Sequence, residues 1–329
     1  MTAIIMPAIS THPPYGTHAA VTSPPAGVDL AVTVDTLVRG VHFPQDTPPA
    51  DIGYKALAVN LSDLAAMGAI PDWAAISLTH PKADDAWISA FNDGIDQLAN
   101  RYHLRFPVAD MGIGPLAITL QIHGQVPHGQ ALRRDSARPH DLIFVTGTIG
   151  DAGLALARRF SAEKYRHIPE KHCGFIEQRL ARPSPRVHEG IALRGIATAA
   201  IDISDGLAAD LSHITDATGL GATLEVERLP LSPALRQLPD RTQAWRLALS
   251  SGDDYELCFT VPPEHCKTLR QAARHFSCPV TRIGRMEKRP GLRILDKNGK
   301  TFSRAGGYRH FVEKIPSEAS PRTDEACGK

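Results

Sequence analysis

Five aspartates of this sequence stand in apolar segments that also contain glycine, which is a costly setting for a carboxylate. An ionised carboxylate is expensive to bury unless it is paired or binds a metal ion. One such residue is ordinarily a helix cap or a turn residue, but five in similar contexts indicate a common site. They are Asp35, Asp63, Asp110, Asp202 and Asp205.

Carboxylates alone would repel the phosphates of a nucleotide, so divalent cations would have to lie between them. Mg²⁺ prefers oxygen ligands and is usually held by a few carboxylates together with substrate phosphates. Asn60 and Asp63 are three residues apart and would share one helix face. Arg134 and Arg186 could neutralise phosphate oxygens, or either could form a surface ion pair.

The glycine-containing loop from Gly147 to Gly150 is a second candidate for phosphate binding. It follows an apolar run and precedes a predicted helix, where backbone N–H groups can receive an anion, so both glycines are candidate ATP-binding residues. No side chain resembles an activated Ser, Cys or His nucleophile. The sequence therefore favours metal-assisted phosphoryl transfer by positioning and charge neutralisation.

Two further glycine motifs do not indicate a nucleotide site. Gly299-Lys300-Thr301 ends like a P-loop, but Ile294 stands where that pattern requires glycine. Gly112-Ile113-Gly114 resembles the start of a dinucleotide fingerprint, but a strand pattern follows it where a helix is needed.

The elements that would position these residues follow from hydrophobic periodicity. The mixed order of helices and strands predicts an α+β fold with antiparallel sheets rather than a strict βαβ series. Asp51 is the expected N-cap of the first helix. Helices are predicted at 51–68, 84–102, 187–194 and 206–218, and another begins at Asp151. Strands are predicted at 30–37, 116–122, 142–145, 224–229 and 255–261, and a hairpin turn at 298–299.

The length of 329 residues favours two domains. We expect an irregular N-terminal arm at 1–28, a dimerisation and ATP/metal domain at 29–140, a C-terminal α+β domain at 141–311 and a frayed tail at 312–329. The net charge is 36 − 35 = +1, which gives no basic field and argues against a nucleic-acid partner.

Other features of the composition exclude further classes. The sequence has no apolar run of about 18 residues that would span a membrane. Its N-terminus lacks the pattern of a secretory signal, so the cytoplasm is the expected location. The five cysteines form no Cys-x-x-Cys pair, which argues against a zinc ribbon or a disulfide framework.

Four stretches resemble the thiamine-monophosphate kinase family of the aminoimidazole-ribonucleotide-synthetase-like superfamily. The similarity extends from about residue 29 to Phe311, and its long KALAVNLSDLAAMGA and DDYELCFTVP segments are specific. The four stretches are VTVDTLVRGVHF, DIGYKALAVNLSDLAAMGAIP, AIDISDGLAADLSHI and SSGDDYELCFTVP.

The resemblance implies a two-domain α+β fold and a homodimer whose N-terminal sheets join across the interface. It implies transfer of the γ-phosphoryl group of ATP to thiamine monophosphate, with Mg²⁺. Arg134 and Ser204 match ATP-contacting positions, and His42 matches a substrate contact. Asp253 stands where the family usually has a substrate-contacting Glu. The residues assigned to metal are Thr33, Asp35, Asp63, Asp110, Asp202 and Asp205.

The sequence also departs from the family pattern, and the family's N-terminal helix is not recognisable in it. His18 lies in GTHAA, where the family has Gly-Asp-Asp-Ala-Ala. Met111 replaces a threonine after Asp110, and Ala305 replaces an aromatic residue. Losing one charge-stabilising group typically lowers a rate by about 10²–10³.

These departures leave alternatives to an active kinase. One is a catalytically impaired homologue that binds nucleotide or thiamine phosphate. Another is a different enzyme of the superfamily, of hydrogenase maturation or selenophosphate synthesis. The latter needs a reactive Cys or selenocysteine near the N-terminus, whereas the first Cys here is Cys173.

Overall fold

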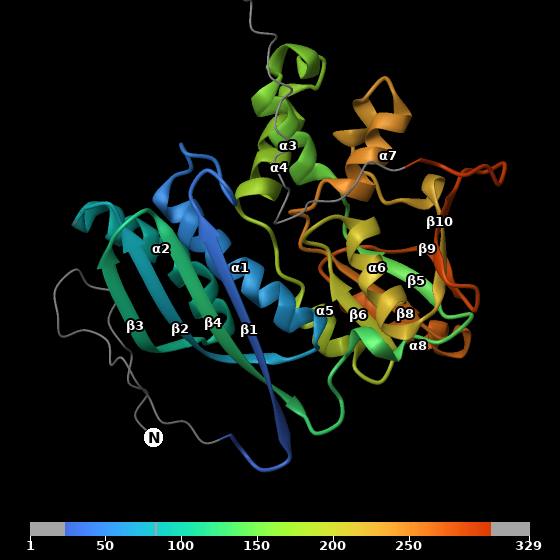
Figure 1. The fold of residues 1–329 in the computed structure, drawn as a ribbon, viewed down its shortest axis with the longest axis horizontal. Helices are drawn as coiled ribbons and strands as arrows, with labels where there is room; N and C mark the ends of the chain where they lie inside the picture. The colour runs from blue at the N-terminus through green and yellow to red at the C-terminus, as the bar shows by residue number, and fades with distance from the viewer. Residues whose placement is uncertain (1–23, 83, 304–329) are drawn as a thin grey trace, which may run out of the picture.

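The computed structural model of this protein describes residues 24–82 and 84–303. Its N-terminal half is a four-stranded sheet with one face covered by two helices, α1 and α2 (Figure 1). The strand order is β1-β4-β2-β3, and β2–β3 is the parallel pair. The elements are β1 (Val28–Val38), α1 (Pro49–Ala66), β2 (Ile70–His80), α2 (Asp85–Tyr102), β3 (Arg105–Ile113) and β4 (Ala117–Pro127).

The C-terminal half is built on a six-stranded sheet of order β10-β7-β9-β5-β8-β6, in which β7–β10 is the parallel pair. Its strands are β5 (Leu142–Thr146), β6 (Ala199–Asp202), β7 (Gly221–Glu225), β8 (Leu257–Val261), β9 (Val280–Glu287) and β10 (Gly291–Leu295). Its helices are α3 (Asp151–Phe160), α4 (Glu170–Ala181), α5 (Val187–Leu193), α6 (Leu207–Thr218), α7 (Arg241–Ser250) and α8 (Cys266–Ala272). Short 3₁₀ segments are η1 (Arg134–Ser136), η2 (Ala162–Tyr165), η3 (Val226–Arg228), η4 (Leu235–Gln237), η5 (Pro263–His265) and η6 (Ala273–His275).

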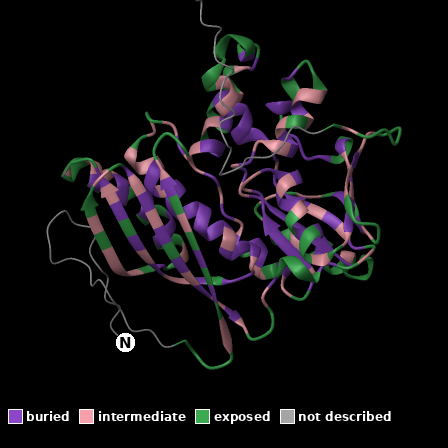
Figure 2. Ribbon diagram, in the orientation of Figure 1, coloured by how far each residue is buried: buried purple, intermediate pink, exposed green. Residues whose placement is uncertain are grey.

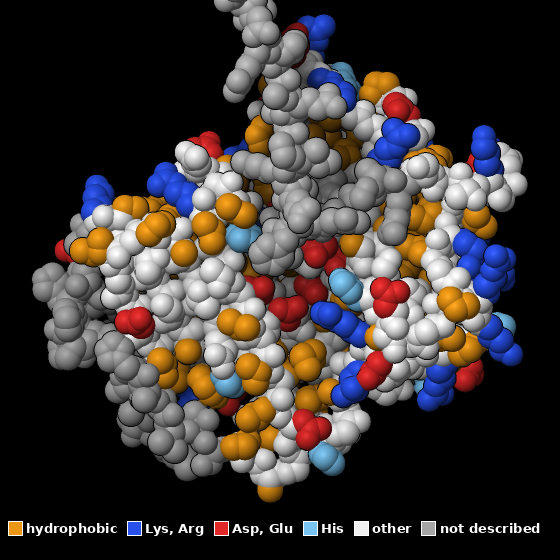
Figure 3. Space-filling model, in the orientation of Figure 1, with side chains coloured by type: hydrophobic (Ala, Val, Ile, Leu, Met, Phe, Trp, Pro, Cys, Tyr) orange, Lys and Arg blue, Asp and Glu red, His pale blue; other side chains and the backbone are white. Residues whose placement is uncertain are grey.

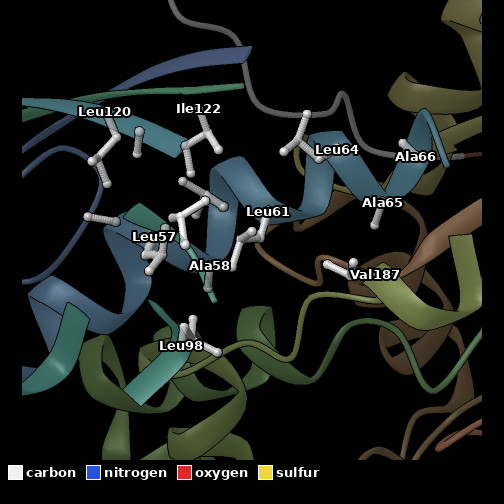
Figure 4. Close-up of a cluster of buried hydrophobic side chains, with 14 of the residues drawn as sticks. Leu57, Ala58, Leu61, Leu64, Ala65, Ala66, Leu98, Leu120, Ile122 and Val187 are labelled. Carbon is white, nitrogen blue, oxygen red and sulfur yellow. The ribbon is translucent and has the colours of Figure 1, made fainter. Parts of the chain in front are cut away.

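Helix α1 lies between the two halves and is buried on nearly every side (Figure 2). Thirteen of its 18 residues are buried. Leu57 and Leu61 lie in a cluster that includes Leu98 of α2, Ile122 of β4 and Val187 of α5 (Figure 4). Because packing fixes α1 against both halves, its side chains are well placed to hold a site between them.

Glycines allow the close approach of α1 and α2. A Cβ atom at Gly94 would lie 1.9 Å from the carbonyl oxygen of Ala50, and one at Gly53 would lie 2.1 Å from that of Phe91. No larger residue fits either position without moving a backbone.

Several sequence predictions need correction. Asp51 is not the N-cap: α1 begins at Pro49, and Asp51 pairs with Arg182 at the first turn. The strand predicted at 224–229 ends at Glu225, because η3 follows, and β2 and β3 were not predicted. Both sheets contain a parallel pair, so they are mixed rather than antiparallel.

The turn at 298–299 is present, but beyond it the described pairing is a single bridge between Leu295 and Thr301. Most of the predicted arm and all of the predicted tail lie outside the described residues. Among the described helices, none combines the length and the hydropathy that crossing a bilayer would require.

Candidate active site

A cavity of about 540 Å³ opens where the two halves meet, and five carboxylates line it. Figure 3 shows acidic side chains gathered in the middle of the molecule, at this junction. The carboxylates come from β1, α1, the end of β6, the loop after it and the loop before β8. They are Asp35, Asp63, Asp202, Asp205 and Asp253. The structure thus brings together four of the five aspartates that the sequence singled out.

The pair Asp35 and Asp63 joins the first sheet to α1. Thr33 and Asp35 are two residues apart on β1, so both side chains point toward α1. Thr33 Oγ1 donates a hydrogen bond to Asp63 Oδ2 at 2.5 Å. Burial and the neighbouring charge of Asp63 raise the pKa of Asp35 to about 7. Two carboxylates held this close favour a bound cation.

Asp202, which belongs to the C-terminal half, lines the same cavity as Asp35 and Asp63. It ends strand β6, and Ser62 Oγ of α1 donates to its Oδ2 at 2.7 Å. Burial raises the pKa of Asp202, and the charge of Asp63 raises it further. Ser62 and Asp63 are neighbours on α1, so this helix contacts the acidic groups of both halves.

Asn60, which the sequence placed on the same helix face as Asp63, has another role. Its side chain is 0% exposed, and its Nδ2 donates to the carbonyl oxygen of Ala56 at 3.1 Å. It lines neither of the two cavities that meet at Asp63.

The loop that follows β6 is shaped by Asp210 of α6, a residue that sequence reasoning missed. Asp210 Oδ2 accepts the backbone N–H groups of Ser204 and Asp205, each at 3.1 Å. Burial raises the pKa of Asp210 to about 7, with a further contribution from the charge of Asp205. The backbone N–H of Asp253 donates to the Ser204 carbonyl at 2.8 Å, which ties this loop to the next one.

Lys55 and Tyr255, also missed from the sequence, hold Asp253. Lys55 Nζ lies 3.1 Å from Asp253 Oδ1, and the Tyr255 hydroxyl donates to the same oxygen at 3.0 Å. Asp253 and Tyr255 both have positive φ angles, of 59° and 49°. Lys55 precedes Asp63 by eight residues, so helical spacing could have placed it on the same face.

His42 lines the same cavity. Its Nδ1 accepts the backbone N–H of Val38 at 2.9 Å, so in the neutral ring the proton is on Nε2.

A second cavity, of about 580 Å³, adjoins the first and shares Val34 and Asp63 with it. Arg134 lines this second cavity together with apolar groups that include Met67 and Leu132. The two cavities thus meet at Asp63, one with arginine and apolar walls and the other with carboxylates.

Asp110 does not join the acidic group of its own chain. It lies on β3, at the opposite sheet edge from Asp35 on β1. Asp35 pairs with Leu120 of β4, and Leu120 pairs with Ile76 of β2. Ile76 is buried on the face that the helices cover, so Asp35 lies on that face. Asp110 is in register with Ser77, the next residue. Since successive strand residues point to opposite faces, Asp110 projects from the other face of the sheet.

Backbone N–H groups of the loop from Gly147 to Gly150 donate hydrogen bonds to other parts of the protein. The Gly147 N–H donates to the Pro279 carbonyl at 2.8 Å, and the Gly150 N–H donates to the Asp254 carboxylate at 2.8 and 2.9 Å. These N–H groups already have acceptors, so the basis for predicting ATP phosphates here is lost. Gly147 lines a separate cavity of about 330 Å³.

Arg186 forms an ion pair, as one of the two sequence interpretations held, but the pair is largely buried and not at the surface. Its Nε and Nη2 donate to the two oxygens of buried Glu256 at 2.7 and 2.6 Å. This bidentate pair raises the pKa of Arg186, although burial opposes it, and occupies the guanidinium.

The residues that differ from the family pattern lie either away from the cavity or outside the described residues. Met111 is in register with buried Leu78 and packs against the hydrophobic cluster of the N-terminal half. His18 and Ala305 lie outside the described residues.

The carboxylates of the cavity form part of a ligand set for a divalent cation. Within residues 24–82 and 84–303, no three His, Cys, Asp or Glu side chains converge on a single metal position. Mg²⁺ usually keeps several waters and takes one or two carboxylates plus substrate phosphates. The adjacent pair Asp35 and Asp63 fits such a partial ligand set.

Comparison with known proteins identifies the family. The chain matches the models "AIR synthase related protein, N-terminal domain" over residues 16–126 and "AIR synthase related protein, C-terminal domain" over residues 138–297. Thiamine-monophosphate kinase of Salmonella typhimurium is 45% identical over 305 residues, which cover 90% of this chain and 91% of that protein.

Solved structures agree. Thiamine-monophosphate kinase from Stenotrophomonas maltophilia K279a has a TM-score of 0.81 and 44% identity, covering 87% of this chain and 90% of that one. The structure described as "AaThiL complexed with AMPPCP and TMP" has a TM-score of 0.75 and 31% identity, covering 88% and 89%. This chain, with its paired AIR synthase related domains, belongs to the thiamine-monophosphate kinase family.

Proposed function

We propose that this protein transfers the γ-phosphoryl group of ATP to the phosphate of thiamine monophosphate, which yields thiamine diphosphate and ADP. The observation that carries the proposal is the pair of cavities that meet at Asp63. An acceptor in one cavity and a nucleotide in the other would present their phosphates to the same carboxylate.

The lining residues support a different substrate for each cavity. Arg134 and the apolar groups around it suit a nucleotide base and its phosphates. His42 and Asp253 line the other cavity, which suits the thiamine moiety of the acceptor. Ser204 lines the carboxylate cavity with them, next to Asp205, where it can contact the phosphate that is transferred. A relative of known structure holds AMPPCP and TMP together.

The chemistry needs positioning rather than a covalent intermediate. An oxygen of the acceptor phosphate attacks the γ-phosphorus in line, and the bond from that phosphorus to the β-γ bridging oxygen breaks as ADP leaves. In this reaction the carboxylates can act only through cations, because their own charge opposes that of the phosphates.

Mg²⁺ is the cation that we propose, and it would supply charge neutralisation at the transferred group. Asp35 and Asp63 would hold it with Thr33 beside them, and Asp202 and Asp205 would face it from the C-terminal half. Thr33 already donates to Asp63, which orients that carboxylate. Asp110 is not among the Mg²⁺ ligands that a single chain would provide.

We also propose that the protein is a homodimer joined through its N-terminal sheets. The uncovered face of the first sheet carries exposed apolar side chains on β1: Leu30, Val32 and Val34 are 46%, 48% and 62% exposed. Asp110 projects from that same face. In this arrangement Asp110 faces the second subunit rather than its own Asp35.

The test is ADP release with thiamine monophosphate and ATP, coupled to direct detection of thiamine diphosphate. We expect turnover that requires Mg²⁺ and stops with EDTA. ATP binding without ADP release would favour the impaired homologue instead. Mg²⁺-independent turnover would overturn the role of the carboxylates.

A further inference from the structure

We propose that Lys55 binds the phosphate of the acceptor and neutralises it for attack on ATP. This inference rests on the proposed function. It assigns a substrate-binding role to a residue whose visible partner is another protein side chain, Asp253.

The first observation is the charge balance of the cavity. Five carboxylates line it, and Lys55 is the one Lys or Arg among its lining residues in the described chain. A phosphate monoester carries about −1.5 to −2 charges at neutral pH. A metal ion shared with ATP can neutralise the transferred group, but the attacking phosphate needs a cation on its own side. Arg134 lines the other cavity, so it does not supply one.

The second observation is where Lys55 lies on α1. Lys55, Val59 and Asp63 are spaced four residues apart, and all three line the cavity. The ammonium group and the carboxylate shared by the two cavities therefore project from one face of one rigid helix. A phosphate bound at Lys55 would lie along that face, on the acceptor side of Asp63.

The third observation is the cost of the buried lysine. The side chain of Lys55 is 3% exposed, and it is the one charged residue among the buried residues of α1. A buried ion pair contributes little net stability, because desolvation of both charges offsets their attraction. A function for the charge accounts for its position better than stability does.

The partners of Lys55 leave it able to take a ligand. An ammonium group has three N–H donors. Asp253 receives one at 3.1 Å, and the Tyr255 hydroxyl also donates to Asp253, which shares the charge of that carboxylate. Asp253 is 30% exposed, so it sits at the cavity wall and holds the ammonium beside the open volume.

The experiment measures KM for both substrates in Lys55→Met. We expect KM for thiamine monophosphate to rise at least tenfold, while KM for ATP stays within about twofold. Lys55→Arg keeps the charge and should recover part of the loss. Lys267→Met removes an exposed lysine of α8 and serves as the matched control.

A ligand without the phosphate separates binding from structure. Thiamine, used as a competitive inhibitor, lacks the group that Lys55 would contact, so its inhibition constant should not change in Lys55→Met. A purely structural lysine would instead weaken thiamine and thiamine monophosphate equally. Equal weakening, or an unchanged KM for thiamine monophosphate, overturns the inference.

Folding is checked by thermal unfolding. If Lys55→Met unfolds because Asp253 has lost its partner, the same measurements are made on Lys55→Gln, whose amide can still donate to Asp253. If the wild-type protein forms no thiamine diphosphate, the proposed function fails. If the wild type is active and the Lys55 variants match it, the inference alone fails.

Discussion

At the residue scale, the site is defined by charges that the fold forces together. Asp35 and Asp63 come from β1 and α1, and Asp202 comes from the other half of the molecule. Each has a pKa raised chiefly by burial. Such crowding destabilises the protein in its charged form, and a bound cation removes the penalty.

This crowding predicts an inverse dependence of stability on pH in the absence of metal. Asp35 has a pKa of about 7 in the folded protein, above its ordinary value of 3.8. The folded state therefore binds more protons between these values, and stability falls as pH rises from about 4 to about 7. Thermal unfolding from pH 4 to pH 8 should show that fall, and Asp35→Asn should make it shallower.

The stabilisation by Mg²⁺ should increase as the pH rises. Since protons compete with the cation for Asp35, the gain in melting temperature on adding Mg²⁺ should be larger at pH 8 than at pH 5. The same Mg²⁺ effect at both pH values, in wild type and Asp35→Asn alike, would show that this carboxylate does not hold the ion.

At the element scale, the loop between β6 and α6 is held by a carboxylate inside the helix that follows. Asp210 accepts the N–H groups of Ser204 and Asp205, and it is 2% exposed. The helix thus shapes the loop that presents both residues to the cavity. Asp210 is a positioning residue, because it acts through them.

Substitution of Asp210 should therefore weaken both fold and binding. Asp210→Ala leaves two N–H groups without their acceptor, at a cost of about 1–3 kcal/mol for a buried group. Asp210→Asn keeps one acceptor oxygen, so its losses of stability and of ATP affinity should be smaller. Urea unfolding gives the stability, and calorimetry gives the affinity for ATP with Mg²⁺.

The control is Asp216→Ala, which removes an exposed carboxylate from the same helix. If Asp210→Ala and Asp216→Ala have the same affinity for ATP, the loop does not depend on Asp210.

At the scale of the whole molecule, the first sheet has one face packed on α1 and α2 and one face uncovered by described residues. Leu30 and Val32 of β1 are 46% and 48% exposed on that uncovered face. Exposed apolar groups gathered on a sheet commonly mark an interface. The proposed homodimer would cover them and would bring Asp110 against a second subunit.

We expect sedimentation at micromolar concentration to show a dimer. Leu30→Lys with Val32→Lys should give a monomer, because burying two charges in an interface of more than about 2,000 Å² is costly. Phe160→Lys is the control, since Phe160 is 82% exposed on α3 in the other half. A monomeric wild type would contradict the prediction, as would dissociation of the Phe160 variant.

The sequence by itself determined several of the local elements and most of the acidic group. A run of β-branched and apolar residues predicted the strand that contains Asp35, and β1 covers it. The helix predicted at 84–102 is α2, and the structure shows Asp84 as its N-cap, with its side chain accepting the Trp87 N–H. These features depend on residues that are close in the sequence, so the sequence alone can predict them.

Tertiary structure alone decided which candidates share the site. Asp110 and Asp35 have similar local sequence settings, but strand order and pleat put them on opposite faces of the sheet. Gly150 has the sequence context of an anion site, but buried Asp254 takes its N–H. Lys55 reaches Asp253 across 198 positions of the chain, at 3.1 Å. Such pairings depend on register and on packing between distant segments, which periodicity within one segment does not encode.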